Sequence, residues 1–388
     1  MLLSPSSVRT GGIESHVADL SDALNAADAD VCMAVGSAPA DAPPPASVRV
    51  IGGLQADDAE SAWPDVEQFV ADTDPQVIHV HNIWDQAFLR RLRRHAPVVQ
   101  SVHGYITCSA GGQRYFKPGD ECHRPHGPGC LGNALLRNCG HRRVPMVSLS
   151  RYRRIEAALG ELRHADSVLA YSNYVARDLR NNGVRRVTAL RPFVRDPGPG
   201  AAAFGDARRV LFAGRVVPDK GLEVLLQALQ HVDATLEVCG DGWGMPRCRR
   251  LADKLGLDGR VTFTGWASEA QLAEAYRRSS VVAVPSLLPE PFGLVGLEAM
   301  IHGRAVVGSD TGGIGEWLAH DVNGYLVRPG DPLALADGLE RALEDPHHSM
   351  ELGRAGREIA LTEFSVEQHL LGLGAVYAQA RTWWDASR

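Results

Sequence analysis

The sequence of 388 residues contains no apolar run long enough to cross a bilayer. Its first residues, Met1-Leu2-Leu3-Ser4-Pro5, lack the basic region and the long apolar segment that an export signal requires. Cysteine is too sparse for a secreted disulfide scaffold, because seven cysteines are spread over the whole chain. These absences predict a cytoplasmic protein.

Lysine and aromatic residues are also scarce. The chain has three lysines, Lys117, Lys220 and Lys254, which leaves few positions for a Schiff base with pyridoxal phosphate. Aromatic residues make up 6% of the sequence, and few of them stand among the arginines. Because single-stranded nucleic acids are commonly bound by aromatic side chains set among basic ones, the composition argues against a nucleic-acid partner.

What is present is typical of a two-domain globular protein. Hydrophobic residues form 45% and charged residues 22% of the chain, and its length exceeds what one hydrophobic core usually supports. The net charge of -6 conceals an asymmetry, because residues 1–85 hold two basic and fourteen acidic residues whereas residues 86–195 hold twenty basic and six acidic ones. The basic span is explained either by solvated helix faces or by attraction to an anionic substrate or a membrane surface.

Short apolar runs alternate with helical patterns along the whole chain. Such alternation predicts an α/β protein with two doubly wound parallel sheets. The runs 76–81 and 98–103 each read as a strand that ends in a histidine, His81 or His103. Since ligands bind at the carboxyl ends of strands in open parallel sheets, both histidines are candidate site residues.

The stretch Glu290–Met300 carries the clearest chemical pattern. It follows the apolar run Val281–Val284, and its own periodicity predicts a helix from Leu294 to His302 after a turn at Gly293. A strand that feeds a helix through a glycine turn leaves the first amides of that helix unbonded. The N-terminus of this helix is therefore a candidate anion site.

Two carboxylates flank that helix start. Glu290 stands before the amides of Phe292, Gly293 and Leu294, and Glu298 stands about two turns into the helix. A bare phosphate would be repelled by the carboxylates, whereas a ligand with hydroxyls on both sides of its phosphates would be held by all of these groups. A nucleotide sugar has this shape.

The spacing Glu-x7-Glu, with Phe292-Gly293-Leu294 inside it, resembles the signature of retaining glycosyltransferases with the GT-B fold, and of glycosyltransferase family 4 in particular. Gly214-Arg215 with Lys220-Gly221, and then Gly240-Asp241-Gly242, are similar to further elements of that family. The resemblance covers nearly the whole chain. Family members usually begin with a longer first strand, so a few native residues are expected to be missing from the start.

The resemblance implies the GT-B fold, in which two Rossmann-like domains face a cleft. It places an N-terminal acceptor-side domain at 1–195 with a Cys-rich insertion at 104–143, a linker at 196–206, a nucleotide-sugar domain at 207–364, and a helix at 365–388 that crosses back to the first domain. Family members often have Asn-Gly and an acidic residue where this chain has Arg191-Pro192-Phe193-Val194.

The resemblance also implies roles for individual residues. The catalytic residues are expected to be His103, Arg215, Lys220 and Glu290. The donor is expected to contact Gly12, Gly240, Asp241, Trp266, Phe292, Gly293, Leu294 and Glu298. The acceptor side is expected to include Glu14, His81 and Tyr105.

The resemblance implies an enzyme that moves a sugar from an NDP-sugar, with UDP favoured, to an acceptor hydroxyl with retention of the anomeric configuration. Arg215 and Lys220 would stabilise the leaving diphosphate, and no Asp-x-Asp pair stands at a plausible donor site, so neither a metal nor another cofactor is expected to be required for catalysis. The acceptor would be a small molecule, a glycan or a lipid-linked compound, from natural-product (aminoglycoside-type) or envelope glycan biosynthesis. Peripheral membrane contact is allowed, and the oligomeric state stays open.

Two rival functions fit parts of the pattern. One is a GT-B sugar-nucleotide epimerase or phosphorylase. A phosphorylase would need a lysine for pyridoxal phosphate, although Lys220 is already assigned to the diphosphate. The other is a non-catalytic protein that binds a nucleotide sugar. Cofactor absorbance would identify a phosphorylase, and a screen for released nucleotide would separate an enzyme from a binding protein.

The segment Cys108–His141 has little helical or strand periodicity. It contains four cysteines, Cys108, Cys122, Cys130 and Cys139, among glycines, prolines and histidines. Thiolates and imidazoles suit Zn²⁺, so a structural zinc site is one interpretation. The spacing lacks the Cys-x2-Cys pattern of a zinc knuckle, so free cysteines or a disulfide are the other.

Overall fold

The computed structural model describes residues 1–5, 12–38, 48–55, 58–105, 115–117, 119–136, 145–198 and 208–387, with the backbone alone at 12–14, 115–117, 134–135 and 145–148. Its contacts divide the chain into two compact units. The first unit holds Met1–Arg114, His123–Pro192 and Val366–Arg388, and the second holds Tyr115–Cys122 and Phe193–Ser365.

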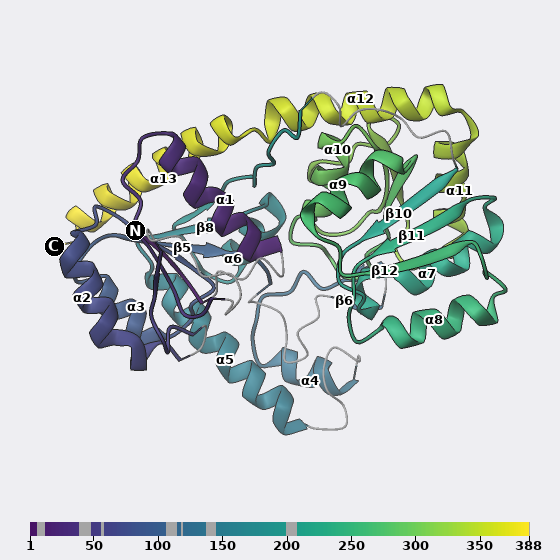
Figure 1. The fold of residues 1–388 in the computed structure, drawn as a ribbon. Helices are drawn as coiled ribbons and strands as arrows, with labels where there is room; N and C mark the ends of the chain where they lie inside the picture. Colours follow the sequence, from purple (N-terminus) through teal and green to yellow (C-terminus); the bar gives the residue numbers. More distant parts are fainter. Residues whose placement is uncertain are drawn as a thin grey trace. The chain divides into compact units, whose positions relative to one another are not determined.

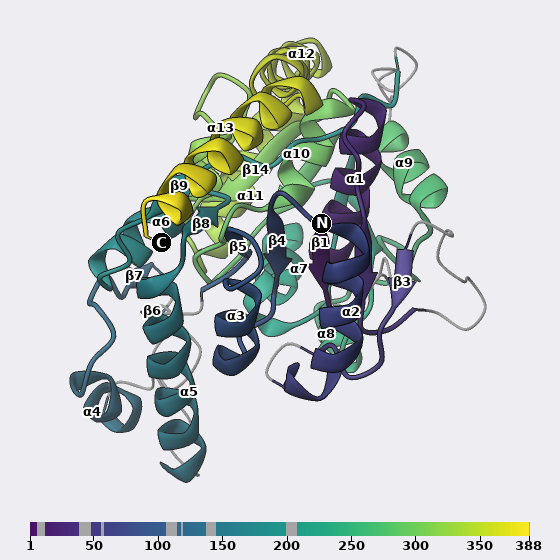
Figure 2. The same cartoon turned by 90° about the vertical axis from the view of Figure 1, so that its left-hand side faces the viewer.

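The first unit is built on a parallel sheet of seven strands in the order β3-β2-β1-β4-β5-β8-β9 (Figure 2). The strands are β1 (Leu2–Ser4), β2 (Met33–Val35), β3 (Val48–Val50), β4 (Ile78–His81), β5 (Val98–Val102), β8 (Ser167–Ala170) and β9 (Val187–Ala189). β1 pairs with both β2 and β4, so the strand order reverses at this point of the sheet. The carboxyl ends of β1 and β4 therefore border a topological switch point, where open α/β sheets bind ligands.

Helices cover this sheet on both faces, and its central strands β4, β5 and β8 are buried along their whole length. They are α1 (Gly12–Ala26), η1 (Glu60–Ala62), α2 (Trp63–Thr73), α3 (Gln86–Leu92), α4 (Gly129–Leu136), α5 (Pro145–His164), α6 (Asn173–Asn181) and α13 (Val366–Asp385). The final helix α13 contacts α1, β5 and β8. Its Tyr377 hydroxyl lies 2.9 Å from Nδ1 of His79, and Trp384 Nε1 donates to the Arg93 carbonyl at 2.9 Å.

The second unit is built on a parallel sheet of six strands in the order β12-β11-β10-β13-β14-β15 (Figure 1). The strands are β10 (Arg209–Ala213), β11 (Thr235–Cys239), β12 (Val261–Gly265), β13 (Val281–Val284), β14 (Ala305–Ser309) and β15 (Gly324–Val327). β10 pairs with β11 on one side and with β13 on the other. The loops that follow β10 and β13 thus diverge at a second switch point.

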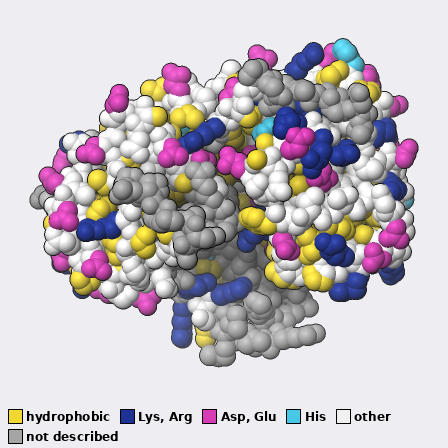
Figure 3. All heavy atoms as spheres, viewed as in Figure 1, with side chains coloured by type: hydrophobic (Ala, Val, Ile, Leu, Met, Phe, Trp, Pro, Cys, Tyr) yellow, Lys and Arg dark blue, Asp and Glu magenta, His cyan; other side chains and the backbone are white. Residues whose placement is uncertain are grey.

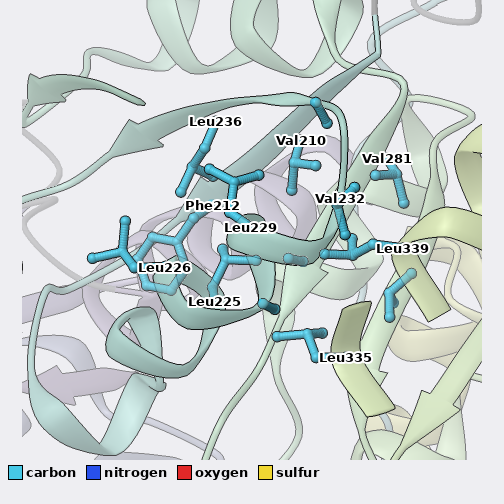
Figure 4. Close-up of a cluster of buried hydrophobic side chains, with 14 of the residues drawn as sticks. Val210, Phe212, Leu225, Leu226, Leu229, Val232, Leu236, Val281, Leu335 and Leu339 are labelled. Atoms are coloured by element: carbon cyan, nitrogen blue, oxygen red, sulfur yellow. The ribbon is translucent and has the colours of Figure 1, made fainter. Parts of the chain in front are cut away.

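Two helical layers cover the second sheet. The unit contains η3 (Pro218–Lys220), α7 (Leu222–Ala228), η4 (Leu229–His231), α8 (Met245–Lys254), α9 (Glu269–Arg278), α10 (Leu294–Ile301), η5 (Ile314–Glu316), α11 (Pro332–Glu344) and α12 (Pro346–Glu363). Alternate side chains of β10 point to opposite faces. Val210 and Phe212 join a cluster with α7, α8 and α11, as Figure 4 shows in part, whereas Leu211 joins α9 and α10.

The Cys-rich segment is more regular than its weak helical and strand periodicity suggests. A two-stranded antiparallel hairpin, β6 (Tyr115–Lys117) with β7 (Asp120–Glu121), is followed by α4. Glycine at 119, with a φ of 78°, makes the tight turn of the hairpin. The hairpin belongs to the second unit by its contacts, although both of its flanks belong to the first.

The predicted fold class is confirmed, because each unit is an α/β domain with a doubly wound parallel sheet. The helices after β15 are separated at Asp345-Pro346, since Asp345 caps α12 and Pro346 is its first residue. Within the described ranges, no helix is both long enough and apolar enough to cross a bilayer.

Candidate functional site

The candidate site of the second unit begins with glycine turns at the ends of β10 and β11. A Cβ on Gly240 would lie 1.8 Å from the carbonyl oxygen of Gly214, and one on Gly242 would lie 2.4 Å from that of Val216. Both glycines also have positive φ angles, 150° and 159°. The two loops can therefore pack backbone against backbone only because side chains are absent here.

Lys220 reaches the site from the loop after β10. It ends η3, and Gly221 then adopts a φ of 72° where a Cβ would lie 1.9 Å from the Pro285 carbonyl oxygen. This close approach joins the loop after β10 to the loop after β13. As a result Lys220 Nζ donates to Glu290 Oε1 at 2.6 Å.

Glu290 is buried, with 6% of its surface exposed, and it is held from two sides. Ser286 Oγ donates to Oε1 at 2.5 Å, beside the Lys220 bond. Burial alone would raise the pKa of Glu290, but the charge and hydrogen bond of Lys220, with Ser286 and Arg215, hold the pKa below its usual range. Glu290 is therefore a fixed, ionised acceptor of hydrogen bonds.

A glycine loop after β14 backs the main chain of Glu290. Gly312 forms an isolated parallel bridge with Glu290, and the Gly313 amide donates to the Glu290 carbonyl oxygen at 2.7 Å. On the same loop, Thr311 Oγ1 and the Gly312 amide both donate to Oε1 of Glu121, at 2.6 Å and 3.1 Å. The hairpin thus supplies an acidic residue that the sequence did not assign to the donor site.

The start of α10 has the geometry of an anion site. Gly293 caps the helix with a φ of 92°, and Leu294 is its first residue. Among the described residues, the amides of Gly293, Leu294 and Val295 have no backbone acceptor. Phe292 does not offer its side chain to a ligand, because the ring is 4% exposed and packs in the core, and its carbonyl oxygen accepts from Trp317 Nε1 at 2.7 Å.

Glu298 lies on α10 and is oriented by a buried phenol. Tyr276 Oη donates to Glu298 Oε2 at 2.9 Å. The Tyr276 ring is 1% exposed and stacks on His302, with ring centroids 4.8 Å apart. Burial, and then the charge of Glu298, raise the pKa of Tyr276 well above its usual value, so the phenol stays a hydrogen-bond donor.

The remaining donor-side candidates lie after β11 and β12. Asp241 is exposed, and its Oδ1 accepts from the Gly242 amide at 2.6 Å. Trp266 follows β12 with 54% of its surface exposed. Trp243, on the loop that follows β11, is 76% exposed and was not predicted. Exposed indole rings at adjacent strand ends are unusual for a folded domain and suit contact with a flat ligand such as a base.

The candidates of the first unit lie in a cluster of aromatic rings. His81 Nδ1 and His103 Nε2 are 2.9 Å apart, and His103 stacks on Tyr171 with centroids 4.6 Å apart. His79 bonds Ser101 Oγ at 2.7 Å, and Ser101 in turn lies 3.1 Å from the Tyr171 hydroxyl. The sequence predicted His81 and His103, but it did not single out their partners His16, His79, Ser101, Tyr171, His369 and Tyr377.

These histidines are neutral. Burial, followed by the proximity of the other rings, lowers the pKa of His16, His79, His81 and His103 well below the usual value. Burial also lowers the pKa of His369 to about 4, against a hydrogen bond from its Nδ1 to the Arg191 carbonyl oxygen that raises it. The strand ends of the first unit therefore present uncharged donors and acceptors.

Other predicted residues are placed only in part. Tyr105 makes an edge-to-face contact with Tyr174, with centroids 5.7 Å apart. Gly12 begins α1, while the side chain of Glu14 lies outside the described part of the structure. Among the cysteines, Cys122 and Cys130 are buried free thiols, and Cys108 and Cys139 lie outside the described residues.

No group of three or more potential metal ligands lies close enough to hold an ion within the part of the chain that the structure describes. Two of the four thiols proposed for zinc fall outside that part, so the zinc interpretation stays a prediction.

Comparison with known proteins identifies the family of this chain. A model of glycosyltransferase family 4 matches residues 10–195, and a model of glycosyl transferases group 1 matches residues 200–359. A D-inositol 3-phosphate glycosyltransferase of Xylanimonas cellulosilytica is 40% identical over 181 residues, which cover 45% of this chain and 43% of that protein. An uncharacterised glycosyltransferase of Methanocaldococcus jannaschii is 38% identical over 144 residues, 36% of this chain and 37% of that protein. The chain thus spans less than half the length of these curated relatives.

Solved structures agree with the fold over the full length. Sucrose-phosphate synthase of Thermosynechococcus elongatus superposes with a TM-score of 0.73 at 23% identity, covering 98% of both chains. HepE of Anabaena, solved with UDP and glucose, superposes with a TM-score of 0.70 at 20% identity, covering 97% of this chain and 99% of that one. The two family models follow one another along the chain, and its domains match those of GT-B proteins; the chain therefore belongs to glycosyltransferase family 4 and has the GT-B fold.

Proposed function

We propose that this protein transfers a sugar from an NDP-sugar, with UDP favoured, to an acceptor hydroxyl. The observation that carries the proposal is the ionised Glu290, held by Lys220 at 2.6 Å next to the amides of Gly293 and Leu294 at the start of α10. A cation, a helix N-terminus and a buried carboxylate within one loop cluster suit a ligand that has a diphosphate and a hydroxylated ring.

The charges suggest how the leaving group would be stabilised. Departure of a nucleoside diphosphate builds negative charge on the phosphate oxygens. Arg215, Lys220 and the amides of Gly293 and Leu294 would donate to that charge, so the mechanism we propose needs no divalent metal. Lys220 would then be shared between the diphosphate and Glu290.

The two glutamates would divide the donor between them. Glu298, oriented by Tyr276, would accept hydrogen bonds from the ribose hydroxyls, and Glu290 would accept them from the sugar near the reacting carbon. Asp241, Trp266 and the backbone at Gly240 would contact the nucleoside. By the family resemblance, His103 would bond the sugar or the forming oxyanion, and the acceptor would attack from the face that the diphosphate leaves, with retention of configuration.

Support for the donor comes from the neighbouring structures, since HepE was solved with UDP and glucose and, separately, with UDP-glucose. The acceptor is less constrained. Several relatives are named D-inositol 3-phosphate glycosyltransferases, which keeps a phosphorylated polyol among the acceptors to test. Aminoglycoside-type and envelope glycan acceptors, with Glu14, His81 and Tyr105 on the acceptor side, follow from the sequence.

The test is a thermal-shift screen of the full chain with UDP, GDP, ADP and dTDP and their glucose, galactose and N-acetylglucosamine derivatives. We expect a uridine nucleotide to raise the unfolding temperature most, and the best donor to release its nucleotide when a suitable acceptor is added. NMR of the product gives its anomeric configuration. Transfer should persist in excess chelator, and a requirement for added Mg²⁺ or Mn²⁺ would contradict the role given to Arg215 and Lys220.

A further inference from the structure

The hairpin β6–β7 brings a carboxylate to the loop that supports Glu290. Glu121 is separated from Thr311 by 190 residues, yet its Oε1 accepts from Thr311 Oγ1 at 2.6 Å and from the Gly312 amide at 3.1 Å. Hydrogen bonds to an ionised acceptor are about twice as strong as those between neutral groups. Because Thr311 is 4% exposed, its bond is also shielded from water.

On the side away from Glu121, the loop packs closely against the main chain of Glu290 and Pro291. A Cβ on Gly312 would lie 2.3 Å from the Glu290 carbonyl oxygen, and one on Gly313 would lie 2.5 Å from that of Pro291. The Gly313 amide also donates to the Glu290 carbonyl oxygen at 2.7 Å. The two glycines are thus packed directly against the main chain of Glu290, with the Glu121 carboxylate bonded to the same loop.

We propose that Glu121 is a positioning residue for Glu290, and that the insertion that carries it is a working part of the donor site. Glu121 fixes the loop of Thr311 and Gly312, and this loop fixes the main chain from which the Glu290 side chain reaches Lys220. The inference rests on the proposed function of Glu290 as the group that binds the reacting sugar.

This arrangement makes a selective prediction. A small displacement of a positioned catalytic group can cost much of the rate. The ribose end of the donor is assigned instead to Glu298 on α10, whose Oε2 accepts from Tyr276 Oη. Loss of the Glu121 bonds should therefore lower turnover and leave the affinity for the free nucleotide unchanged.

The experiment compares Glu121→Leu with Glu121→Gln in the full chain. Both hydrogen bonds end on one oxygen, so glutamine can still accept both while it lacks the charge. We expect kcat to fall about tenfold in Glu121→Leu and to stay within about twofold of wild type in Glu121→Gln. Calorimetry should give the same Kd for UDP in all three proteins. Asp120→Asn is the matched control, because Asp120 is an exposed acid on the same hairpin.

Each outcome decides the inference. Wild-type turnover in Glu121→Leu would overturn it, and equal damage in leucine and glutamine variants would replace the positioning role with a role for the charge. If Glu121→Leu does not fold, Thr311→Val removes one of the two donors at nearly constant volume and should still lower kcat without changing the Kd for UDP; unchanged kcat there would overturn the inference. If the wild-type protein itself does not bind UDP, by contrast, the proposed function is refuted.

Discussion

The two units wind their sheets by the same rule but line the strand ends with opposite chemistry. In the first unit the strand ends carry imidazole and phenol rings, with His81 and His103 bonded to each other at 2.9 Å. In the second unit the strand ends are followed by charged side chains, with Lys220 bonded to Glu290 at 2.6 Å. Parallel sheets create a binding crevice by their topology, and the side chains at its rim decide what enters.

The difference follows from the partners that each unit provides for its buried ionisable side chains. A charge can stay buried only with a partner and further hydrogen bonds, as Glu290 does with Lys220 and Ser286. His81 and His103 of the first unit bond each other instead, and burial drives both to the neutral form. One unit thus offers fixed charges that suit a diphosphate, and the other offers neutral hydrogen-bonding groups that suit hydroxyls.

The unequal charge of the sequence follows this division only loosely. The basic span 86–195 lies mostly in the first unit, and much of it is on helices rather than at strand ends. Figure 3 shows Lys and Arg side chains over the part of the surface that α5 occupies in Figure 1. Surface charge and site charge are therefore separate features of this protein.

The largest effect should come from the ionic site. We expect Glu290→Gln to lower kcat by about 100-fold, the size of loss seen when one preorganised polar group is taken from a catalytic site. Steady-state kinetics with the donor found by the screen measure it. Glu340→Gln removes a carboxylate that pairs with Arg208 on the surface of the same unit, and it should leave kcat unchanged. Full activity in Glu290→Gln would contradict a catalytic role for the charged groups of the second unit.

The next largest effect should be a difference between the two units in how acid lowers their stability. Each of the five buried histidines of the first unit has a folded pKa below its unfolded value of about 6.5, so the unfolded state binds more protons as the pH falls below that value. Stability is then complete above about pH 6.5 and is lost as the pH falls, by up to about 1.4 kcal/mol per pH unit for each histidine. In the second unit Glu290 keeps its contribution to stability until the pH falls to about 4.5, and burial lowers the pKa of His302.

Calorimetry between pH 7.5 and 5 should therefore show one transition moving to lower temperature ahead of the other. His369→Gln can still donate to the Arg191 carbonyl oxygen but cannot titrate, so it should reduce the slope of stability against pH. His347→Gln, at a side chain that is 70% exposed, should not. Parallel movement of both transitions would contradict the contrast between a neutral and an ionic unit.

Donor affinity should depend on the phenol that orients Glu298. We expect Glu298→Ala to raise the Kd for the nucleotide about tenfold and Tyr276→Phe to raise it about fivefold, which corresponds to about 1 kcal/mol, the net value of a typical hydrogen bond. The Tyr276→Phe effect should vanish for a nucleotide that lacks the ribose hydroxyls bound by Glu298. Tyr325→Phe loses a comparable bond, to His348 at 2.9 Å in the same unit, and should bind the nucleotide normally. An equal loss for both nucleotides would mean that Tyr276 supports only the fold.

Sequence patterns predicted the architecture and the local structure around Glu290, because both depend on local signals. The apolar run before Glu290 and the glycine at 293 predicted a strand, a turn and a helix start, and the structure has all three. What the sequence could not reach are contacts between distant segments. Tyr276 and Glu298 lie on two different helices, and nothing in the local pattern of α9 marks its tyrosine.

The hairpin shows the same limit more sharply. Glycine and proline around Asp120 suggested irregular structure, and no local rule connects Glu121 with Thr311. The histidine cluster is an intermediate case. Two of its members follow from strand ends, while His16 and His369 come from α1 and α13 and join them only through packing.

The smallest expected effect concerns the exposed basic residues of α5. Arg153 and Arg154 are exposed on this helix, and surface charges of this kind change binding through the long-range field. The field is screened over about 10 Å at 0.1 M salt. We therefore expect the double variant Arg153→Glu, Arg154→Glu to change the acceptor KM by only about two- to threefold, and added salt to reduce the difference from wild type.

The sign of that change identifies the acceptor class. If the acceptor is anionic, the variant should raise its KM, because two attractive charges become repulsive. If it is a cationic aminosugar, KM should stay the same or fall. Arg354→Glu, on an exposed position of α12 in the second unit, is the control for a change in net charge alone. If KM for a charged acceptor is equal in wild type, double variant and control at low salt, the basic residues of α5 act only as a solvated helix face, and the acceptor is selected by the neutral rings of the first unit.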